Sequence, residues 1–163
     1  MAIRKHEREV TDLAEQLAIM ERCDVCRLAL NGEDGYPYLL PLNFGIREEN
    51  GRVCLLFHGA VEGTKFALME RDSRASFEMD CAHELDYQEE RGYCTMYYES
   101  IIGRGRLRIL DDDEKEAALD AIMMHYHPEN VEYNHAAIPR TTCYMLEVEQ
   151  MTGKRKAQKK KRG

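Results

Sequence analysis

The residues best suited to hold a charged ligand lie in the segment FHGAVEGTK, at positions 57–65. Gly59 and Gly63 flank a short loop, and Thr64 and Lys65 stand where a helix is expected to begin. The first turn of a helix leaves backbone N–H groups unpaired, so a hydroxyl and an ammonium beside them complete an anion site. The segment therefore predicts a phosphate-binding loop.

Lys65 and His58 are the two side chains of this segment that could take part in chemistry. A lysine at a helix N-terminus faces partial positive charge, which is unfavourable unless an anion lies between them. His58 ends the preceding predicted strand, and an imidazole titrates near neutral pH, so it could move a proton. Taken alone, a histidine at a strand end is more often a structural hydrogen-bonding residue.

The cysteines and the remaining histidines do not indicate a metal centre. Cys23 and Cys26 have CxxC spacing, but no second CxxC and no paired histidines follow at zinc-finger distance. Several of the six cysteines stand in apolar segments, where a reduced thiol acts as a small hydrophobic residue. His125 and His127 lack partners at recognisable spacing. We predict no metal site.

The elements that position the loop are predicted to be strands. Alternating apolar residues and turn signals predict six of them, at 25–30, 38–44, 53–57, 74–79, 93–110 and 141–149. Asn50 and Gly51 predict a tight reversal between the second and the third. Pro41 predicts an edge strand, because proline lacks an N–H group. Gly103 and Gly105 predict a bend within the fifth strand.

The predicted helices are short and few. Apolar residues at helical spacing predict helices at 12–22, 64–71 and 113–126, while 80–92 and 125–140 are predicted to be loops. No regular crossover helices separate the strands, which favours an antiparallel barrel over a doubly wound sheet. The predicted fold is mainly β (α+β), a six-stranded antiparallel β-barrel with two or three peripheral helices.

The composition is typical of a soluble globular domain. Apolar residues make up 44% of the 163 residues and charged residues 33%. No apolar run approaches the ~18 residues that span a bilayer, so we predict no membrane association. The first ten residues, MAIRKHEREV, lack the apolar core of a signal peptide. We therefore expect a cytoplasmic protein.

The charge is distributed unevenly. Residues 154–162 contain seven Lys or Arg and no acid, although the whole chain carries a formal charge of −7. The remainder is therefore strongly acidic, which argues against nucleic-acid binding by a folded surface. We predict one domain over residues 1–153, followed by a basic, disordered tail over residues 154–163.

Five segments, taken in order, resemble a known protein family. They are RLAL at 27–30, PYLLPLNFG at 37–45, FHGAVEGTK at 57–65, FEMD at 77–80 and YYESIIGRGRL at 97–107. From about residue 4 to residue 154 the chain resembles the nitroimidazole-resistance (nitroimidazole reductase) branch of the pyridoxamine 5′-phosphate oxidase-like flavoproteins. The combination of PLNFG with FHxAxEGxK is specific, whereas each fragment alone is weak.

The resemblance implies a split β-barrel that forms a homodimer and holds FMN between the subunits. The implied FMN contacts run from the isoalloxazine edge through the ribityl chain to the phosphate: Pro41, Leu42, Asn43, Phe44, Phe57, His58, Gly59, Gly63, Thr64, Lys65 and Ser100. His58 is the implied catalytic residue, and Arg27 is a further candidate for a cofactor contact. True pyridoxamine phosphate oxidases carry an additional arginine where this chain has Thr64, and an arginine-rich C-terminal strand that it lacks.

The resemblance therefore implies an FMN-dependent reductase. It would take electrons from a reduced nicotinamide and pass them to a small aromatic acceptor such as a 5-nitroimidazole. Two alternatives stay open. One is a flavin-binding or sensing module without turnover, and the other is a barrel that binds a different planar cofactor, such as haem or a deazaflavin.

Overall fold

The computed structural model describes residues 5–129 and 132–157. Its strands and α-helices are β1 (Glu9–Val10), α1 (Leu13–Met20), β2 (Cys26–Asn31), β3 (Pro37–Leu42), β4 (Gly45–Glu49), β5 (Arg52–Ala60), α2 (Thr64–Arg71), β6 (Arg74–Gln88), β7 (Tyr93–Ile109), α3 (Lys115–Tyr126) and β8 (Thr141–Lys156). Short 3-10 turns lie at His6–Arg8, Glu89–Arg91, Asp112–Glu114 and His135–Arg140. Within the described residues, no helix is both long and apolar enough to span a membrane.

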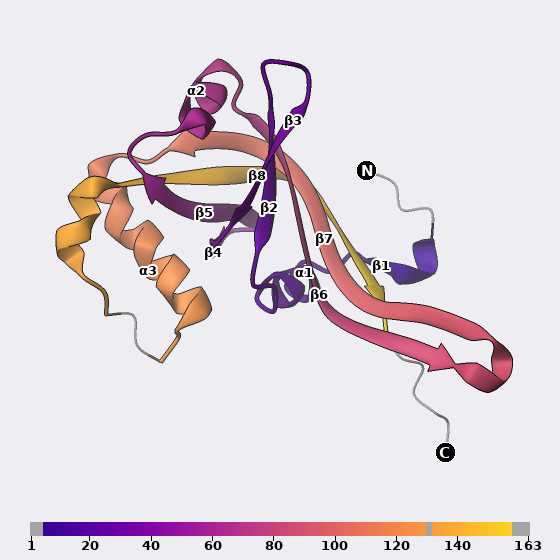
Figure 1. The fold of residues 1–163 in the computed structure, drawn as a ribbon. Helices are drawn as coiled ribbons and strands as arrows, with labels where there is room; N and C mark the ends of the chain where they lie inside the picture. The colour runs from indigo at the N-terminus through magenta and orange to yellow at the C-terminus, as the bar shows by residue number, and fades with distance from the viewer. Residues whose placement is uncertain (1–4, 130–131, 158–163) are drawn as a thin grey trace.

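The strands form one strongly curved sheet, with the order β3-β2-β6-β7-β8-β5-β4 and with β1 added beside β8. Every pairing in this sheet is antiparallel. The long strands β7 and β8 bend around the centre of the molecule (Figure 1). A shift of register between Arg104 and Gly105 marks a bulge, in which Glu149 of β8 is the extra residue and which lies beside the glycines that predicted a bend. The fold is the predicted mainly β, antiparallel split barrel, with eight strands in the described chain rather than six.

The prediction for residues 38–57 was only partly right. Asn50 and Gly51 do form a tight turn, with φ of 54° and 80°, but the turn joins β4 to β5. The segment predicted to pair across this turn is β3, which pairs with β2. Pro41 explains the arrangement, because a residue without an N–H group is tolerated at the sheet edge that β3 occupies.

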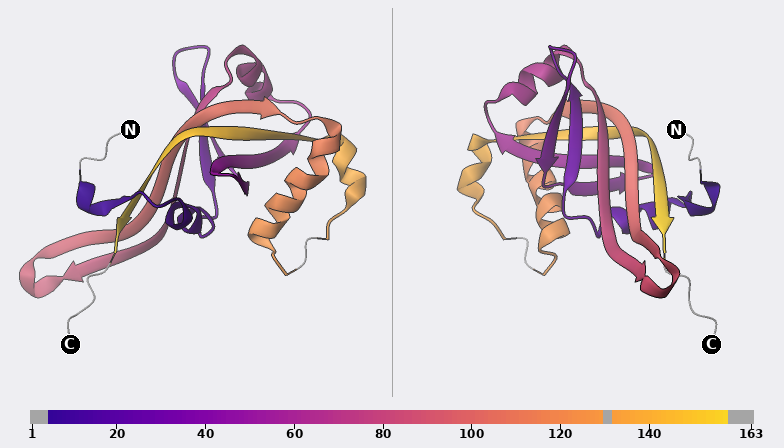
Figure 2. Two further views of the ribbon diagram at one scale, coloured as in Figure 1. Left: turned by 180° about the vertical axis from the view of Figure 1, so that it is seen from behind. Right: turned by 45° about the vertical axis from the view of Figure 1, so that its right-hand side comes forward.

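The acidic segment 80–92 was wrongly predicted to be a loop. It completes β6, which turns through Glu89–Arg91 into β7 and forms a long hairpin. We call residues 84–97 of this hairpin the arm. The arm extends well beyond the barrel (Figure 2). Its first strand, residues 84–88, escaped prediction because neither side of the arm is covered by the barrel, so polar residues occupy positions that a buried strand would fill with apolar ones. Its second strand begins at Tyr93, as predicted.

The last strand also runs further than predicted. β8 continues to Lys156, and Lys154 and Lys156 pair with Ser100 and Tyr98 of β7. The predicted tail boundary at residue 154 therefore falls inside a strand, because β7 offers backbone partners to these charged residues. Positions 158–163 of the predicted tail lie outside the described residues.

Two apolar clusters stabilise the fold. The larger one fills the barrel and includes Phe44, Phe57, Phe77, Leu28, Leu55, Met79, Ile101 and Tyr144. The smaller one lies between the sheet and α3 and consists of Leu56, Leu110, Ala118, Ile122, Cys143 and Met145. Each large apolar side chain that is fully buried contributes roughly 1.5–3 kcal/mol relative to an exposed one.

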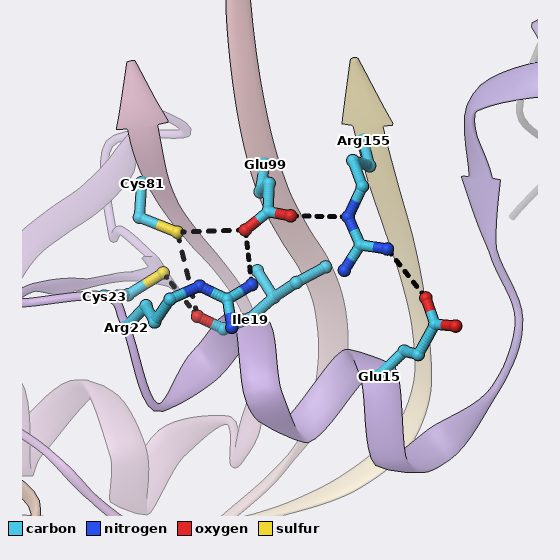
Figure 3. A network of polar contacts seen from close by, with 7 residues as sticks. All are labelled: Glu15, Ile19, Arg22, Cys23, Cys81, Glu99 and Arg155. Carbon is cyan, nitrogen blue, oxygen red and sulfur yellow. Dashed lines mark hydrogen bonds and ion pairs between the residues drawn. The ribbon is translucent and has the colours of Figure 1, made fainter. Parts of the chain in front are cut away.

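A polar network ties α1 to the sheet (Figure 3). Asp12 caps α1 by accepting the Glu15 N–H at 2.9 Å. The carboxylate of Glu99 on β7 accepts hydrogen bonds from both Arg22 and Arg155. Arg155 also donates to Glu15 at 2.7 Å. Glu99 thereby links Arg155, near the end of β8, to Arg22, just after α1. Through Arg155 the network also reaches Glu15 near the start of α1.

Candidate cofactor site

The predicted phosphate loop places Lys65 against two glycines. Gly63 precedes α2 with φ of 147°, a backbone conformation that L-residues with side chains rarely adopt. A β-carbon added at Gly59 would lie 2.9 Å from Lys65 Nζ and 3.1 Å from its Cε. Lys65 Nζ also lies 4.5 Å from the centre of the Phe66 ring. The ammonium thus occupies space that only a glycine at position 59 leaves open.

The start of α2 is electropositive. Gly63 offers no side-chain cap, and the first turn of α2 contains no acidic residue. Across the described part of the chain, no carboxylate forms an ion pair with Lys65. Unpaired backbone N–H groups and an unneutralised ammonium therefore face the same loop. This is the arrangement expected of a site that takes an anionic group.

His58 lies immediately before this loop. It is on β5, opposite Cys143 of β8, and its side chain is open to solvent on one side. Partial burial among neighbouring atoms, and secondly the positive charge of Lys65, lower the pKa of His58. The imidazole is therefore neutral at pH 7, with one nitrogen that donates and one that accepts a hydrogen bond.

Phe57 supports the site from inside the barrel and does not line it. Its side chain is fully buried and stacks on Tyr144 with ring centres 5.4 Å apart. Tyr144 in turn meets Phe66 edge to face at 5.9 Å. This series of rings runs from β5 through β8 to α2. It holds Phe66, the residue next to Lys65, in place. The Phe57 ring is packed on all sides, so any contact of this residue with a cofactor would involve its backbone.

Phe44 is likewise a core residue. Its side chain is fully buried, and its ring centre lies 4.4 Å from that of His125. Its backbone N–H donates to the Tyr126 hydroxyl at 3.2 Å. Both its ring and its N–H therefore have partners within the chain, so the ring is not free to lie along a flavin. The sequence showed Tyr126 only as part of a His-Tyr-His motif near a helix end, so its role was missed.

Tyr126 fixes the segment that leads from β3 to β4. Its hydroxyl donates to the carbonyl oxygen of Asp24 at 2.8 Å and also hydrogen-bonds the Asn43 side chain. β4 and β5 are antiparallel and Gly45 pairs with Leu56, so the residues just before Gly45 run alongside β5 in the direction of His58. Tyr126 thus holds Asn43, which the sequence analysis named as an FMN contact, on this segment.

Pro41 and Leu42 lie further along β3. Pro41 is exposed and sits opposite Arg27, and Leu42 is half-buried opposite Cys26. The Arg27 guanidinium donates to Asp80 at 2.6 Å and to Glu78 at 3.1 Å, so its charge is already balanced. Arg27 is therefore less suited than Lys65 to bind an anion.

Ser100 is not brought to His58 within one chain. It lies on β7 opposite Lys154, whereas His58 lies opposite Cys143. These two β8 residues are eleven positions apart, which is roughly 36 Å along a strand. Gly59, Gly63, Thr64 and Lys65 form one compact group beside His58, and Ser100 belongs to a different part of the sheet.

The CxxC pair does not form a reactive site. Cys23 and Cys26 are both buried, and burial raises the pKa of the Cys26 thiol to about 12. Such thiols carry almost no thiolate at neutral pH and pack as apolar groups. Within residues 5–129 and 132–157, no three His, Cys, Asp or Glu side chains are grouped so that they could hold a metal ion.

Comparison with known proteins assigns the chain to a family. The family model for pyridoxamine 5′-phosphate oxidase matches residues 12–155. The chain therefore belongs to the pyridoxamine 5′-phosphate oxidase-like family. No protein with a curated description matches it.

Three solved structures show the same fold. A proposed 5-nitroimidazole antibiotic resistance protein from Bacteroides thetaiotaomicron is 31% identical, with a TM-score of 0.76 over 90% of this chain and 85% of its own. The FAD and haem binding protein from Mycobacterium smegmatis is 17% identical, with a TM-score of 0.77 over 93% and 74%. The flavocytochrome Anf3 from Azotobacter vinelandii is 17% identical, with a TM-score of 0.75 over 96% and 73%.

Proposed function

We propose that this protein binds FMN and acts as an oxidoreductase that reduces small nitroaromatic compounds. The observation that carries the proposal is the position of Lys65. Its ammonium lies over Gly59, beside the uncapped start of α2, and has no carboxylate partner among the described residues. A phosphate monoester fits this arrangement, since it would receive both the ammonium and the backbone N–H groups.

The residues of the loop would bind and orient the cofactor. Lys65 and the N–H groups of Thr64 and Lys65 would hold the FMN phosphate, and the Thr64 hydroxyl would add a donor. Asn43, held by Tyr126, would offer its amide towards the ring system. When bound, FMN supplies hydride transfer, while the protein supplies binding, orientation and electrostatics.

His58 would act on the acceptor. Its lowered pKa keeps the imidazole neutral near pH 7, so one ring nitrogen donates a hydrogen bond to a polar group such as a nitro oxygen. The fraction of His58 that is protonated near pH 7 would donate a proton as negative charge builds on the acceptor, and general-acid catalysis of this kind typically contributes 10²–10⁴-fold to a rate. The 31% identity to a proposed 5-nitroimidazole resistance protein supports a nitroaromatic acceptor.

We propose further that the site lies between two copies of the chain. In one protomer, the β8 residues that pair with Ser100 and with His58 are far apart along the strand. A homodimer would allow Ser100 of one copy to approach the loop of the other. A cavity of about 1290 Å³ beside the arm is lined by none of the predicted cofactor residues. A site completed by a partner would explain why it is not enclosed within one chain.

The test has two stages. Absorbance of the purified protein and mass analysis of any released chromophore separate FMN from FAD, haem and a deazaflavin. An anaerobic assay with NADH or NADPH and a 5-nitroimidazole then separates an enzyme from a module that only binds flavin. Released FMN and acceptor-dependent oxidation of the nicotinamide are the expected results. A colourless protein that ignores added FMN would overturn the proposal, and a flavoprotein without turnover would overturn its enzymatic part.

A further inference from the structure

Two thiols meet beside the polar network that ties α1 to the sheet. Cys23 follows α1 and is 1% exposed, and Cys81 lies on β6 and is 9% exposed. Figure 3 shows both sulfur atoms converging on the carbonyl oxygen of Ile19, at 3.2 Å from Cys23 and 3.8 Å from Cys81. The two thiols also hydrogen-bond each other. Their sulfur atoms are therefore direct neighbours.

This neighbour of Cys23 could not be read from the sequence. CxxC spacing points to Cys26, the first residue of β2. Cys81 is far away in the chain, and it reaches Cys23 because β6 pairs with β2 and passes beside the end of α1. A disulfide between Cys23 and Cys81 would therefore close a long loop, the case in which a cross-link most restricts the unfolded chain.

The surroundings of the two thiols assign them different parts in an oxidation. Burial raises the pKa of Cys81, but the hydrogen bond from Cys23 and the guanidinium of Arg22 oppose this rise, while Glu99 adds to it. Burial also raises the pKa of Cys23, and its contact with Cys81 adds to that rise. Cys81 is thus the more accessible thiol and the better nucleophile, and Cys23 is the thiol that would react second.

The backbone beside Cys81 can accommodate a new bond. The pairing of β6 with β7 shifts register between Cys81 and Glu84, and Ala82 between them has φ of 55°. Cys81 therefore ends a regular stretch of pairing, so its position can adjust without disturbing pairs on both sides. The Ile19 carbonyl also accepts the backbone N–H of Arg22 at 3.1 Å. It stays paired when both thiols turn away from it.

We propose that Cys23 and Cys81 form a redox-sensitive disulfide that attaches the end of α1 to β6. The oxidant is a hydroperoxide. The Cys81 sulfur attacks its outer oxygen, the O–O bond breaks, and the leaving oxygen takes the Cys81 proton, so that Cys81 becomes a sulfenic acid. The Cys23 sulfur then attacks the Cys81 sulfur, the S–O bond breaks, and the hydroxyl leaves as water with the Cys23 proton. The two thiols together lose two electrons, which reduce the hydroperoxide.

The disulfide would reinforce an attachment that otherwise depends on charge. In the reduced protein the α1 region is held by hydrogen bonds from Arg22 and Arg155 to Glu99. A covalent bond does not weaken when this carboxylate is protonated, and it limits the freedom of the unfolded chain. The thermal midpoint of the oxidised protein should be about 5–10 °C higher than that of the reduced protein. The proposal does not depend on which cofactor, if any, the protein binds.

The first experiment identifies the bond. The full chain carries Cys94→Ser, which removes an exposed thiol that could link two molecules. It is treated with hydrogen peroxide, and the remaining thiols are blocked with iodoacetamide. Non-reducing digestion with trypsin should give a peptide in which residues 23–27 are joined to residues 75–91, and fragmentation distinguishes Cys23 from Cys26. Dithiothreitol before digestion should abolish this peptide and reverse the rise of the thermal midpoint.

Single substitutions in the same background test the pairing. Cys23→Ala and Cys81→Ala should each abolish both the linked peptide and the rise of the thermal midpoint. Cys26→Ala is the matched control, because Cys26 is as buried as Cys23 and is the partner that CxxC spacing suggests. It should retain both. Circular dichroism of each reduced variant shows whether it is folded. If a variant does not fold, the linked peptide of the chain that keeps all three cysteines still decides the result.

The outcomes divide as follows. A Cys23–Cys81 peptide together with a raised thermal midpoint supports the proposal. A chain that gives no linked peptide, or that links Cys26 in place of Cys23, would overturn it. So would a link that leaves the thermal midpoint unchanged, because the bond would then add nothing to the attachment of α1. Flavin content enters none of these readouts, so failure of the proposed function leaves this result unchanged.

Discussion

Lys65 Nζ lies so close to Gly59 that a side chain there would collide with it. A β-carbon on Gly59 would be 2.9 Å from Lys65 Nζ. The two residues come from different elements, β5 and α2, and the loop between them brings the ammonium back over the strand. Gly59 therefore determines where the positive charge of the loop stands.

Gly59→Ala should weaken FMN binding through Lys65. The added methyl group would push the flexible end of Lys65 away from its position, at little cost in folding stability. Losing one hydrogen bond to a charged group costs about 1.5–3 kcal/mol, which corresponds to roughly 10- to 150-fold in Kd. Titration with FMN, followed by quenching of flavin fluorescence, measures the change.

The Lys65→Ala variant provides the control for this prediction. It should weaken FMN binding at least as much as Gly59→Ala while the barrel stays folded. If Gly59 acts through Lys65, the double variant should bind FMN about as weakly as Lys65→Ala alone. Additive effects would show that Gly59 contributes by a separate route, and unchanged affinity in Lys65→Ala would remove the phosphate assignment.

His58→Gln should separate binding from turnover. Glutamine retains a hydrogen-bond donor but cannot transfer a proton at neutral pH, so FMN should remain bound while acceptor reduction falls by about 10²–10⁴-fold. Steady-state rates with a nitroimidazole, measured beside the flavin content of each preparation, test this. Full activity in the variant would exclude His58 from the chemistry.

His58 should also give folding stability a dependence on pH. Burial and Lys65 lower the pKa of His58 in the folded protein, so between that pKa and the unfolded value near ~6.5 the unfolded chain binds more protons. Acid therefore favours unfolding, and stability should fall as the pH drops from 7 to 5. The difference in the free energy of unfolding between the wild type and His58→Asn, measured by urea unfolding at both pH values, should be smaller at pH 5 than at pH 7. A constant difference would contradict the lowered pKa.

Phe44→Ala should mainly lower the stability of the fold and should affect cofactor binding only as a consequence. The ring is fully buried against His125, so its removal should lower the free energy of unfolding by about 3–5 kcal/mol, with or without flavin. Leu39→Ala, at an exposed position, should change the stability of the monomer by less than about 0.5 kcal/mol. A stable Phe44→Ala variant that loses only flavin would restore Phe44 as a cofactor contact.

Glu99→Gln should weaken the attachment of α1. Burial alone would raise the pKa of Glu99, but hydrogen bonds from Arg22 and Arg155 outweigh burial and lower it. Its stabilising contribution is therefore present above the unfolded pKa of ~4.3 and is lost as the pH falls below that value. At pH 7 the variant should lose roughly 1–3 kcal/mol.

The control for Glu99→Gln is Glu149→Gln. Glu149 accepts from Arg106 at 2.9 Å, but both side chains are more than half exposed, so this ion pair should contribute less than about 1 kcal/mol. Urea unfolding at pH 7 and pH 3 measures both variants. Equal losses would mean that the network around Glu99 is no stronger than a surface ion pair.

The order and type of most elements could be read from the sequence because local patterns determine them. Apolar alternation predicted the strands that bury one face, and the Asn50-Gly51 pair predicted its tight turn. The FHGAVEGTK segment predicted the loop around Lys65 for the same reason, since all of its parts lie within nine residues.

Tertiary structure decided what depends on partners far away in the chain. The sequence alone could not show that Phe44 and Phe57 face the core, because an aromatic residue suits a core and a cofactor equally well. It could not show that residues 84–88 form the first strand of the arm, because no part of the barrel covers this strand and its apolar residues are not buried. By resemblance it assigned Ser100 and His58 to the same cofactor, whereas the pairing of β8 with β7 and with β5 separates these two residues within one chain. Local propensity determines elements, but the register of distant strands determines which side chains meet.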